Sequence, residues 1–230
     1  MRAFTFANVN GFQGGARTVR AYKRVANKGS VLMLAEAWRY RDELKKALPA
    51  TWAMVHRDGE SPAIAYNAKV WQCLGHGFFH VHETIPGVSD SREAAYAVLR
   101  DRDSKETILV VACHLTPSAW SNRFGLKKRL RIRRVWKKGL LATLRNTRRL
   151  QEKYGVPAVI GADVNHKGRT WSRRLGGRQI RYVSDGIDKL AFIDYDDRVW
   201  ALRASERTLT PLGTGDGHRG ITVRAMTRRP

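Results

Sequence analysis

The feature that most constrains this chain is a series of short apolar runs that end in polar side chains. The stretch VIGADVNH, residues 159–166, shows the pattern, because an apolar run closes on Asp163, Asn165 and His166. Short runs of this kind, rich in Val, Ile and Ala, favour buried β-strands. We therefore expect a chain built largely from strands whose ends carry polar groups.

Similar segments recur along the chain. We expect strands in AFTFANV, SVLMLAEAW, AAYAVLRD, TILVVACHL, PAVIGADVN, KLAFID, RVWALRA and GITVRAM. TWAMVHR, PAIAYNA and VWQCLGHGFFHVHET are expected to follow one another as hairpins, and RDSKE fits a hairpin turn. A Gly- and Arg-rich loop is expected after PAVIGADVN.

Helical patterns lie between some of these strands. We expect helices in residues 15–29, in RDELKKAL, and from about Asn122 to Tyr154, where Gly155 ends the pattern and Gly139 could kink it. No repeat or linker divides the chain. It is expected to form one α/β domain over residues 1–230, and the hairpins argue against a doubly wound parallel sheet.

The net charge indicates the kind of partner. Lys and Arg total 43 against 20 Asp and Glu, which gives a formal net charge of +23. An excess of this size is typical of proteins that bind a polyanion, most often nucleic acid. An anionic membrane surface, or solubility alone, would also account for it.

The N-terminus and the cysteines suggest a location inside the cell. MRAFTFANVNGF lacks the apolar core of a signal peptide, and no stretch is apolar enough to span a membrane. Cys73 and Cys113 each lie in an apolar segment, which fits buried thiols in a reducing compartment. We expect a cytoplasmic protein, most simply a monomer.

Polar side chains stand at the ends of several expected strands. Each alone has an ordinary explanation, because Asn and Asp are common turn residues and a single His is more often structural than catalytic. Their recurrence is informative, because strand ends at one edge of a sheet converge and would form an oxygen-rich site for a hard divalent cation, flanked by imidazoles. The candidate site residues are Asn8, Asn10, Glu36, His114, Asp163, Asn165, Asp188, Asp216 and His218.

This order of residues resembles the endonuclease/exonuclease/phosphatase superfamily, which includes pancreatic-type deoxyribonucleases and exonuclease III-like enzymes. The resemblance covers almost the whole chain, from FANVNGF to GHRGITVRA. GADVN is similar to the family's Gly-Asp-x-Asn, and VVACHL is similar to its His-Leu strand end. MLAEAW is similar to its Leu-Gln-Glu, with Ala35 in place of Gln.

The resemblance implies a four-layered α/β sandwich, in which two packed, mostly antiparallel sheets are flanked by helices. It implies that Glu36 is the principal metal-binding carboxylate and that Asn8 assists it. Asn10 stands where some members have a second acid on the metal side. Glu60 would orient His114, as an acid does in the deoxyribonuclease branch.

The resemblance also implies catalytic roles. Asp163 would orient or activate the attacking water, and Asn165 would hold a phosphate oxygen. His114 would contact the phosphate or help the leaving oxygen depart. His218 would be the general base or a phosphate contact, with its tautomer fixed by Asp188.

The closing motif departs from the family's usual Ser-Asp-His. Here the chain reads Asp216-Gly217-His218, so glycine occupies the usual Asp position. Asp216 would then reach the site through the flexible glycine, or the acid would be lost and activity reduced. We expect function to be retained, because His218 and the strand after it fit the family's pattern.

The expected cofactor is Mg²⁺ or Mn²⁺. A phosphodiester is anionic and repels hydroxide, and a divalent cation can neutralise the phosphate and stabilise the departing oxygen. Mg²⁺ keeps several waters and needs few carboxylates, so one glutamate with amide oxygens would be sufficient.

Two basic clusters are the expected nucleic-acid contacts. Between Arg123 and Lys153 there are thirteen Lys or Arg residues and one acid, Glu152, and a second cluster follows the Asp-x-Asn motif. No base-reading motif is present, so we expect contacts to the phosphate backbone that weaken steeply with salt. The candidate contact residues are Lys127, Lys128, Arg131, Arg134, Lys167, Arg169, Trp171, Arg173, Arg174 and Arg178.

Three functions remain open at this point. The first is a divalent-metal-dependent nuclease that hydrolyses phosphodiester bonds, most simply a DNA endonuclease with little sequence specificity. The second is a phosphatase or phosphodiesterase acting on a small phosphorylated substrate. The third is a catalytically impaired nucleic-acid-binding protein of the same fold.

Overall fold

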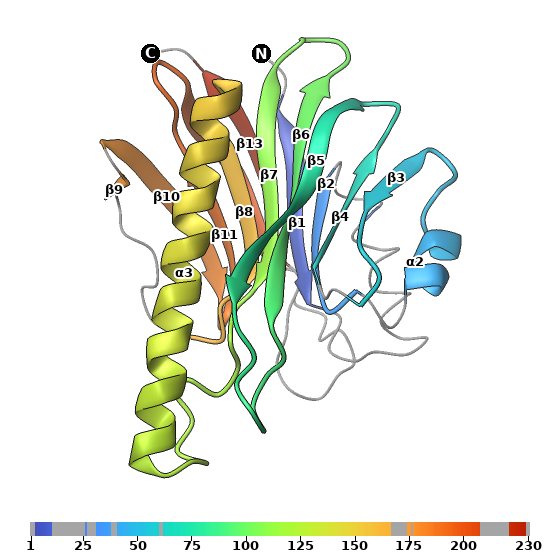
Figure 1. Cartoon of the computed structure of the whole chain (residues 1–230). Coiled ribbons are helices and arrows are strands. Elements are labelled where there is room, and N and C mark those ends of the chain that lie inside the picture. Colours follow the sequence, from blue (N-terminus) through green and yellow to red (C-terminus); the bar gives the residue numbers. More distant parts are fainter. Residues whose placement is uncertain are drawn as a thin grey trace.

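The first of two sheets contains both ends of the described chain. The computed structural model describes residues 3–10, 26, 31–37, 41–59, 62–166, 174–175, 177–207 and 221–228. Within these residues the first sheet has six strands in the order β12-β13-β1-β2-β4-β3 (Figure 1). Their bounds are β1 (Phe4–Asn10), β2 (Val31–Ala35), β3 (Trp52–Val55), β4 (Ala63–Asn67), β12 (Val199–Arg207) and β13 (Ile221–Arg228).

The second sheet is formed by the middle of the chain. Its described strands run in the order β5-β6-β7-β8-β11-β10-β9. Within each sheet one pair of strands is parallel, β1 with β2 and β7 with β8, and the other pairs are antiparallel. The bounds are β5 (Trp71–His82), β6 (Arg92–Asp101), β7 (Thr107–His114), β8 (Ala158–Asp163), β9 (Arg174–Leu175), β10 (Arg178–Asp185) and β11 (Asp188–Ile193).

Two described helices lie outside the sheets (Figure 1). The short helix α2 spans Arg41–Ala47 beside the first sheet, and the long helix α3 spans Leu126–Tyr154 along the second. Gly155 ends α3 in the left-handed conformation, with its N–H bonded to the carbonyl of Gln151, as the sequence predicts. The helix expected in residues 15–29 lies outside the described residues, apart from Ala26.

The core has three parts, and their order defines four layers. One cluster lies between the sheets, with the rings of Phe6, Phe192 and Trp200 in edge-to-face contact. A second packs α3 on the outer face of the second sheet, and a third packs Leu44 and Leu48 on the outer face of the first. The predicted four-layered sandwich of mostly antiparallel sheets is therefore confirmed.

The two sheets approach each other closely at Gly161 of β8. A β-carbon there would lie 2.5 Å from Cβ of Met33 and 3.0 Å from Oδ1 of Asn8. Asn8 also spans the gap, because its amide nitrogen donates to the carbonyl of Ala162 at 3.1 Å. The missing side chain at position 161 thus lets β8 pack directly on β1 and β2.

Two expectations about the strands are wrong. β4 and β5 do not form a hairpin, because β4 pairs with β2 and β3 whereas β5 pairs with β6 in the other sheet. Trp71 starts β5 by burying its ring between the sheets against Phe4. The stretch after Asp163 was expected to be only a loop, but it contains β9 and β10. Arginines stand at positions where apolar residues would have shown the alternating pattern of a strand, although Ile180 is buried.

Two expectations about α3 also need correction. The helix begins at Leu126 rather than near Asn122 and continues through Gly139 without interruption. Gly139 instead allows close approach, because a β-carbon there would lie 3.2 Å from Cγ1 of Val81 in β5. The glycine therefore serves helix-on-sheet packing.

Gly161→Ala should destabilise the fold. The added methyl would overlap Met33, so the sheets must separate at a cost of about 1–3 kcal/mol in the free energy of unfolding. Urea denaturation measures the loss. Gly125→Ala is the control, because nothing lies within 4 Å of the added carbon and its φ is −56°. Equal stability of the two variants would contradict the close approach.

Cys113 should resist alkylation in the folded protein. Burial raises the pKa of its thiol to about 12, so the group stays protonated below that pH and the reactive thiolate is nearly absent. Iodoacetamide at mildly alkaline pH should label the partly exposed Cys73 first, as read by mass spectrometry. After unfolding in urea both should react. Labelling of Cys113 as fast as Cys73 would contradict its burial.

Candidate active site

The polar strand ends of the two sheets meet at one end of the sandwich. In the first sheet β1 and β2 run parallel, with Asn10 beside Ala35, so Asn8 and Glu36 are carried to the same edge. In the second sheet the parallel register places His114 beside Asp163, and the antiparallel register places Asp163 beside Asp188. The convergence expected from the sequence is therefore observed for these residues.

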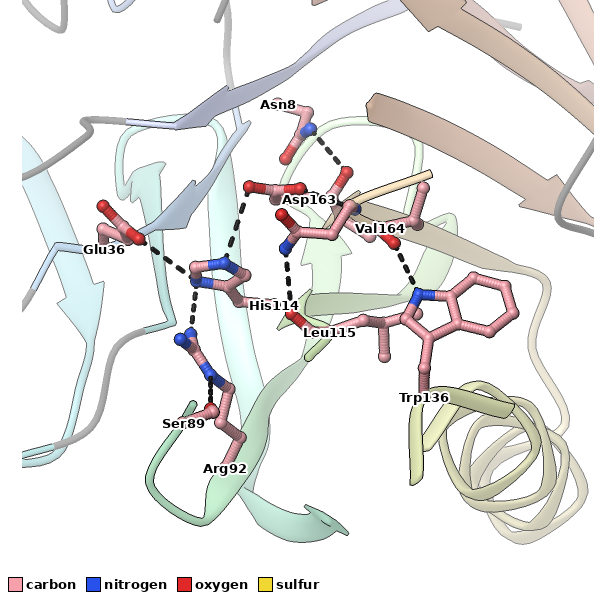
Figure 2. A network of polar contacts seen from close by, with 11 residues as sticks. Asn8, Glu36, Ser89, Arg92, His114, Leu115, Trp136, Asp163 and Val164 are labelled. Atoms are coloured by element: carbon pink, nitrogen blue, oxygen red, sulfur yellow. Dashed lines mark hydrogen bonds and ion pairs between the residues drawn. The ribbon is translucent and has the colours of Figure 1, made fainter. Parts of the chain in front are cut away.

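His114 lies at the centre of this group (Figure 2). Its Nε2 is 3.5 Å from Oδ2 of Asp163, and its Nδ1 is 3.7 Å from Oε1 of Glu36. The side chains of His114 and Asp163 are almost fully buried, whereas that of Glu36 is 19% exposed. Of the three side chains, that of Glu36 is therefore the most open to solvent.

Arg92, which the sequence analysis did not single out, also reaches His114. Its guanidinium Nη1 contacts Nδ1 of the imidazole, and its Nε donates to Oγ of Ser89 at 3.2 Å (Figure 2). Arginine is always a donor, so Nδ1 acts as the acceptor and a neutral His114 carries its proton on Nε2. That proton faces Asp163.

The position of Arg92 could have been inferred from the expected hairpin. β6 and β7 are antiparallel, with Arg100 opposite Thr107, and the same register continued to the strand ends sets Glu93 opposite His114. Arg92 is the neighbour of Glu93, so a hairpin that turns at residues 102–106 brings the guanidinium of Arg92 beside the imidazole of His114.

Backbone strain occurs at two of the site residues. Glu36 and Asn165 have φ values of 57° and 51°, in the left-handed region that costs roughly 1–2 kcal/mol for a residue with a side chain. Glu36 directly follows the last residue of β2, and Asn165 lies two residues beyond the last residue of β8. At Asn165 two hydrogen bonds hold the turn, because its N–H donates to Oδ1 of Asp163 at 2.8 Å and its Nδ2 donates to the carbonyl of Leu115, 50 residues earlier in the chain, at 2.9 Å.

An aromatic cluster supports this turn from the side of α3. Nε1 of Trp136 donates to the carbonyl of Val164 at 2.7 Å (Figure 2). The ring of His166 lies 5.5 Å from Trp136 and 4.5 Å from Trp120. Burial, and then the charge of the buried Lys189, lower the pKa of His166, which favours an uncharged ring. The helix is thus fastened to the strand end that carries Asp163.

The donor set fits a hard cation bound through few protein ligands. No three His, Cys, Asp or Glu residues in the described ranges are grouped as a metal site. Mg²⁺ does not need such a group, because it retains waters and binds through one or two carboxylates. The partly exposed carboxylate of Glu36 and the amide oxygen of Asn8 are the chemically suitable ligands.

Several predicted residues cannot be placed. Asn10 and Arg174 lie in β1 and β9, but only their backbones are described. The other predicted residues outside the described ranges are Glu60, Lys167, Arg169, Trp171, Arg173, Asp216 and His218. Their proposed roles therefore stay predictions.

The basic residues that can be placed fall at two ends of the molecule. Lys127, Lys128, Arg131 and Arg134 lie in the first turns of α3, at the end of the sandwich where β1 and β8 finish (Figure 1). Arg178 starts β10, whereas Asp185, seven residues later, lies next to Asp188 at the site end. The guanidinium of Arg178 lies 3.9 Å from the carboxylate of Glu152 and 4.7 Å from the ring of Tyr195. The structure thus does not bring Arg178 to the site.

Comparison with solved structures identifies the fold. The chain superposes with a TM-score of 0.71 on an endonuclease/exonuclease/phosphatase structure from Bacteroides vulgatus, at 12% identity, covering 99% of this chain and 100% of that one. D. rerio TDP2 complexed with a single-strand DNA product gives 0.69 at 12% identity, covering 98% and 100%. A Bacteroides thetaiotaomicron mannosyl-6-phosphatase gives 0.64 at 14% identity, covering 97% and 99%.

These matches confirm the fold expected from the resemblance. The chain has the endonuclease/exonuclease/phosphatase fold over almost its whole length. Comparison of the sequence with models of protein families and with curated proteins finds no match. None of the helices in the described ranges is long and apolar enough to cross a membrane.

Trp136→Phe should weaken the support of the strand end. The change removes the donor to the buried carbonyl of Val164, at a cost of about 1–3 kcal/mol in the free energy of unfolding. Denaturant unfolding measures the difference. Trp120→Phe is the control, because it shortens another ring of the same aromatic cluster, 43% exposed, without removing the bond to Val164, and it should cost less. Equal losses would show that the indole bond contributes nothing.

Proposed function

We propose that this chain is a divalent-metal-dependent nuclease that hydrolyses phosphodiester bonds in nucleic acid, most simply DNA, with little sequence specificity. The observation that carries the proposal is the meeting of Glu36, His114 and Asp163 at the end of the sandwich where the cation-rich start of α3 lies. The fold supports a phosphoester substrate, because matched structures include a DNA-product complex and a sugar phosphatase.

A cation held by Glu36 and Asn8 would supply charge neutralisation at the phosphate and at the departing oxygen. The chain's own groups would arrange the rest. Asp163 accepts hydrogen bonds, so it can orient a water molecule opposite the scissile bond. The Nε2 proton of His114 faces Asp163, so the imidazole would position that carboxylate, and it would donate to a phosphate oxygen or to the leaving oxygen by turning this proton from Asp163 to the substrate.

The reaction requires that one proton leave the water as its oxygen bonds to phosphorus. We assign this proton to His218, with Asp188 as its orienting acid, as the family resemblance implies. The bond from phosphorus to the leaving oxygen breaks in the same displacement, and that oxygen ends protonated. Arg92 adds a fixed positive charge beside the phosphate and holds the His114 ring in place.

Charge distribution favours nucleic acid over a small phosphate ester. The chain carries +23, and the start of α3 presents four candidate contact residues along one helix. A small ester needs only a local pocket, whereas a polymer of phosphates can contact cations spread along a surface. A phosphatase acting on a small substrate is the second candidate, supported by the sugar phosphatase of the same fold.

Supercoiled plasmid DNA provides the direct test. The protein should convert it to nicked circles with Mg²⁺ or Mn²⁺ and not with EDTA. His114→Ala should slow nicking by about 10²–10⁴-fold, because it removes a positioned proton donor. His76→Ala is the matched control, since this exposed histidine lies in β5 away from the described cluster.

Three results would contradict the nuclease. Nicking that persists at full rate in His114→Ala would indicate a contaminant or another site. Plasmid binding without cleavage at any cation would indicate a binding protein. Release of inorganic phosphate from a small monoester, with intact plasmid, would indicate the phosphatase.

A further inference from the structure

A groove lies between the start of α3 and the loop that joins β5 to β6, at the end of the sandwich that carries the candidate site (Figure 1). Its volume is about 640 Å³, in the range of pockets that hold one compact ligand. Lys128 reaches across it, because its Nζ would lie 3.5 Å from a β-carbon on Gly87 of the loop. The groove is lined by Ile85, Pro86, Lys127, Lys128, Leu130, Arg131 and Arg134.

The loop that forms one wall also leads into the candidate site. Ser89, four residues after Ile85, accepts the hydrogen bond from Arg92, and Arg92 contacts His114 (Figure 2). The groove is therefore connected to the imidazole through a short segment of chain. A polymer with one phosphate at His114 would follow this segment to reach the groove.

The lining combines positive charge with apolar surface. Four of the seven lining residues are Lys or Arg, and none is acidic. The other three are Ile85, Pro86 and Leu130, and Leu130 is 53% exposed although it is a leucine. The partner that matches this lining carries repeated negative charge and also exposes apolar faces.

Single-stranded nucleic acid has both properties at once. Its phosphates repeat along the backbone, and its unpaired bases present flat apolar faces. In a duplex the base faces are stacked inside, so the exposed leucine would have no partner. An anionic bilayer fits less well, because a flat surface cannot enter a concave groove.

We propose that this groove binds a single-stranded segment adjoining the scissile phosphate, with phosphates on the four cations and a base against Leu130. The proposal rests on the proposed function, because it takes the candidate site to hold a phosphodiester. It goes further by naming the strandedness of the substrate and a contact that is not electrostatic. A duplex substrate would then need a frayed or unpaired stretch at this position.

Binding without cleavage separates this proposal from the nuclease activity. A fluorescein-labelled single strand and the same sequence closed into a duplex are titrated with protein in EDTA and followed by fluorescence anisotropy. The single strand should bind more tightly. Leu130→Ser should weaken single-strand binding roughly threefold to tenfold through lost apolar contact and leave duplex binding unchanged.

Matched variants on the same helix control for general effects. Leu141→Ser replaces another exposed leucine, 46% exposed, that does not line the groove, and should change neither affinity. Arg131→Gln should lower the slope of log affinity against log salt by about 0.7, the value for one lost single-strand phosphate contact. Arg145 is exposed and its guanidinium donates to the carbonyl of Leu141 in the same helix, so Arg145→Gln should leave this slope unchanged.

The outcomes distinguish the two proposals. Single-strand preference lost in Leu130→Ser supports the groove even if no cleavage is found with any cation. Equal affinities for the single strand and the duplex, both unaffected by Leu130→Ser, would overturn the single-strand proposal. The plasmid-nicking test of the proposed function would be unaffected by that result. The protein could instead sediment with anionic phosphatidylserine vesicles, lose this in Leu130→Ser, and show no preference for single-stranded DNA. That result would assign the groove to membranes and overturn the proposal.

Discussion

The packing of β8 on β1 and β2 is the contact on which the candidate site depends. Gly161 has no side chain, so Met33 and Asn8 of the opposite sheet can lie against its backbone. Stacked sheets ordinarily stand about 10 Å apart with side chains filling the space between them. At this point the space is closed, and a hydrogen bond from Asn8 to Ala162 joins the sheets directly. Glu36 from one sheet can therefore come within 3.7 Å of His114 from the other.

Charge is distributed unevenly around this junction. The candidate site gathers acids within a chain of net charge +23, with Arg92 in contact with His114 and the start of α3 at the same end of the sandwich. Acids alone would attract a cation and repel a phosphate. With cations around them, the same place would attract a polyanion over long range and hold a divalent ion locally, as the proposed function requires. This arrangement suits chemistry at a phosphate better than simple storage of a metal ion.

The sequence predicted the parts of the site that depend on local patterns. The strand ends at His114 and Asp163 follow from apolar runs that stop at polar residues, and the hairpin register also contained the position of Arg92. The assignment of β4 and β5 to different sheets was not predictable in this way, because period-two alternation identifies a strand but not its neighbour. β10 was missed because arginines occupy the positions that would otherwise show alternation. Gly139 was misread for a different reason, because its close packing against Val81 depends on a residue distant in the chain.

The start of α3 shows how much local stability the basic surface costs. The N-terminal end of a helix carries partial positive charge, so acids there stabilise it and cations destabilise it by about 0.3–1 kcal/mol each. The first turn of α3 contains no acid, and Lys127 and Lys128 stand in it. Gly125 offers no side-chain cap, so the first amide groups lack the usual acceptor. Packing of Ile132 and Trp136 on the second sheet holds the helix in place despite this. A phosphate group bound between Lys127 and Lys128 would supply the missing negative charge, so occupation of the groove would also stabilise the helix that forms it.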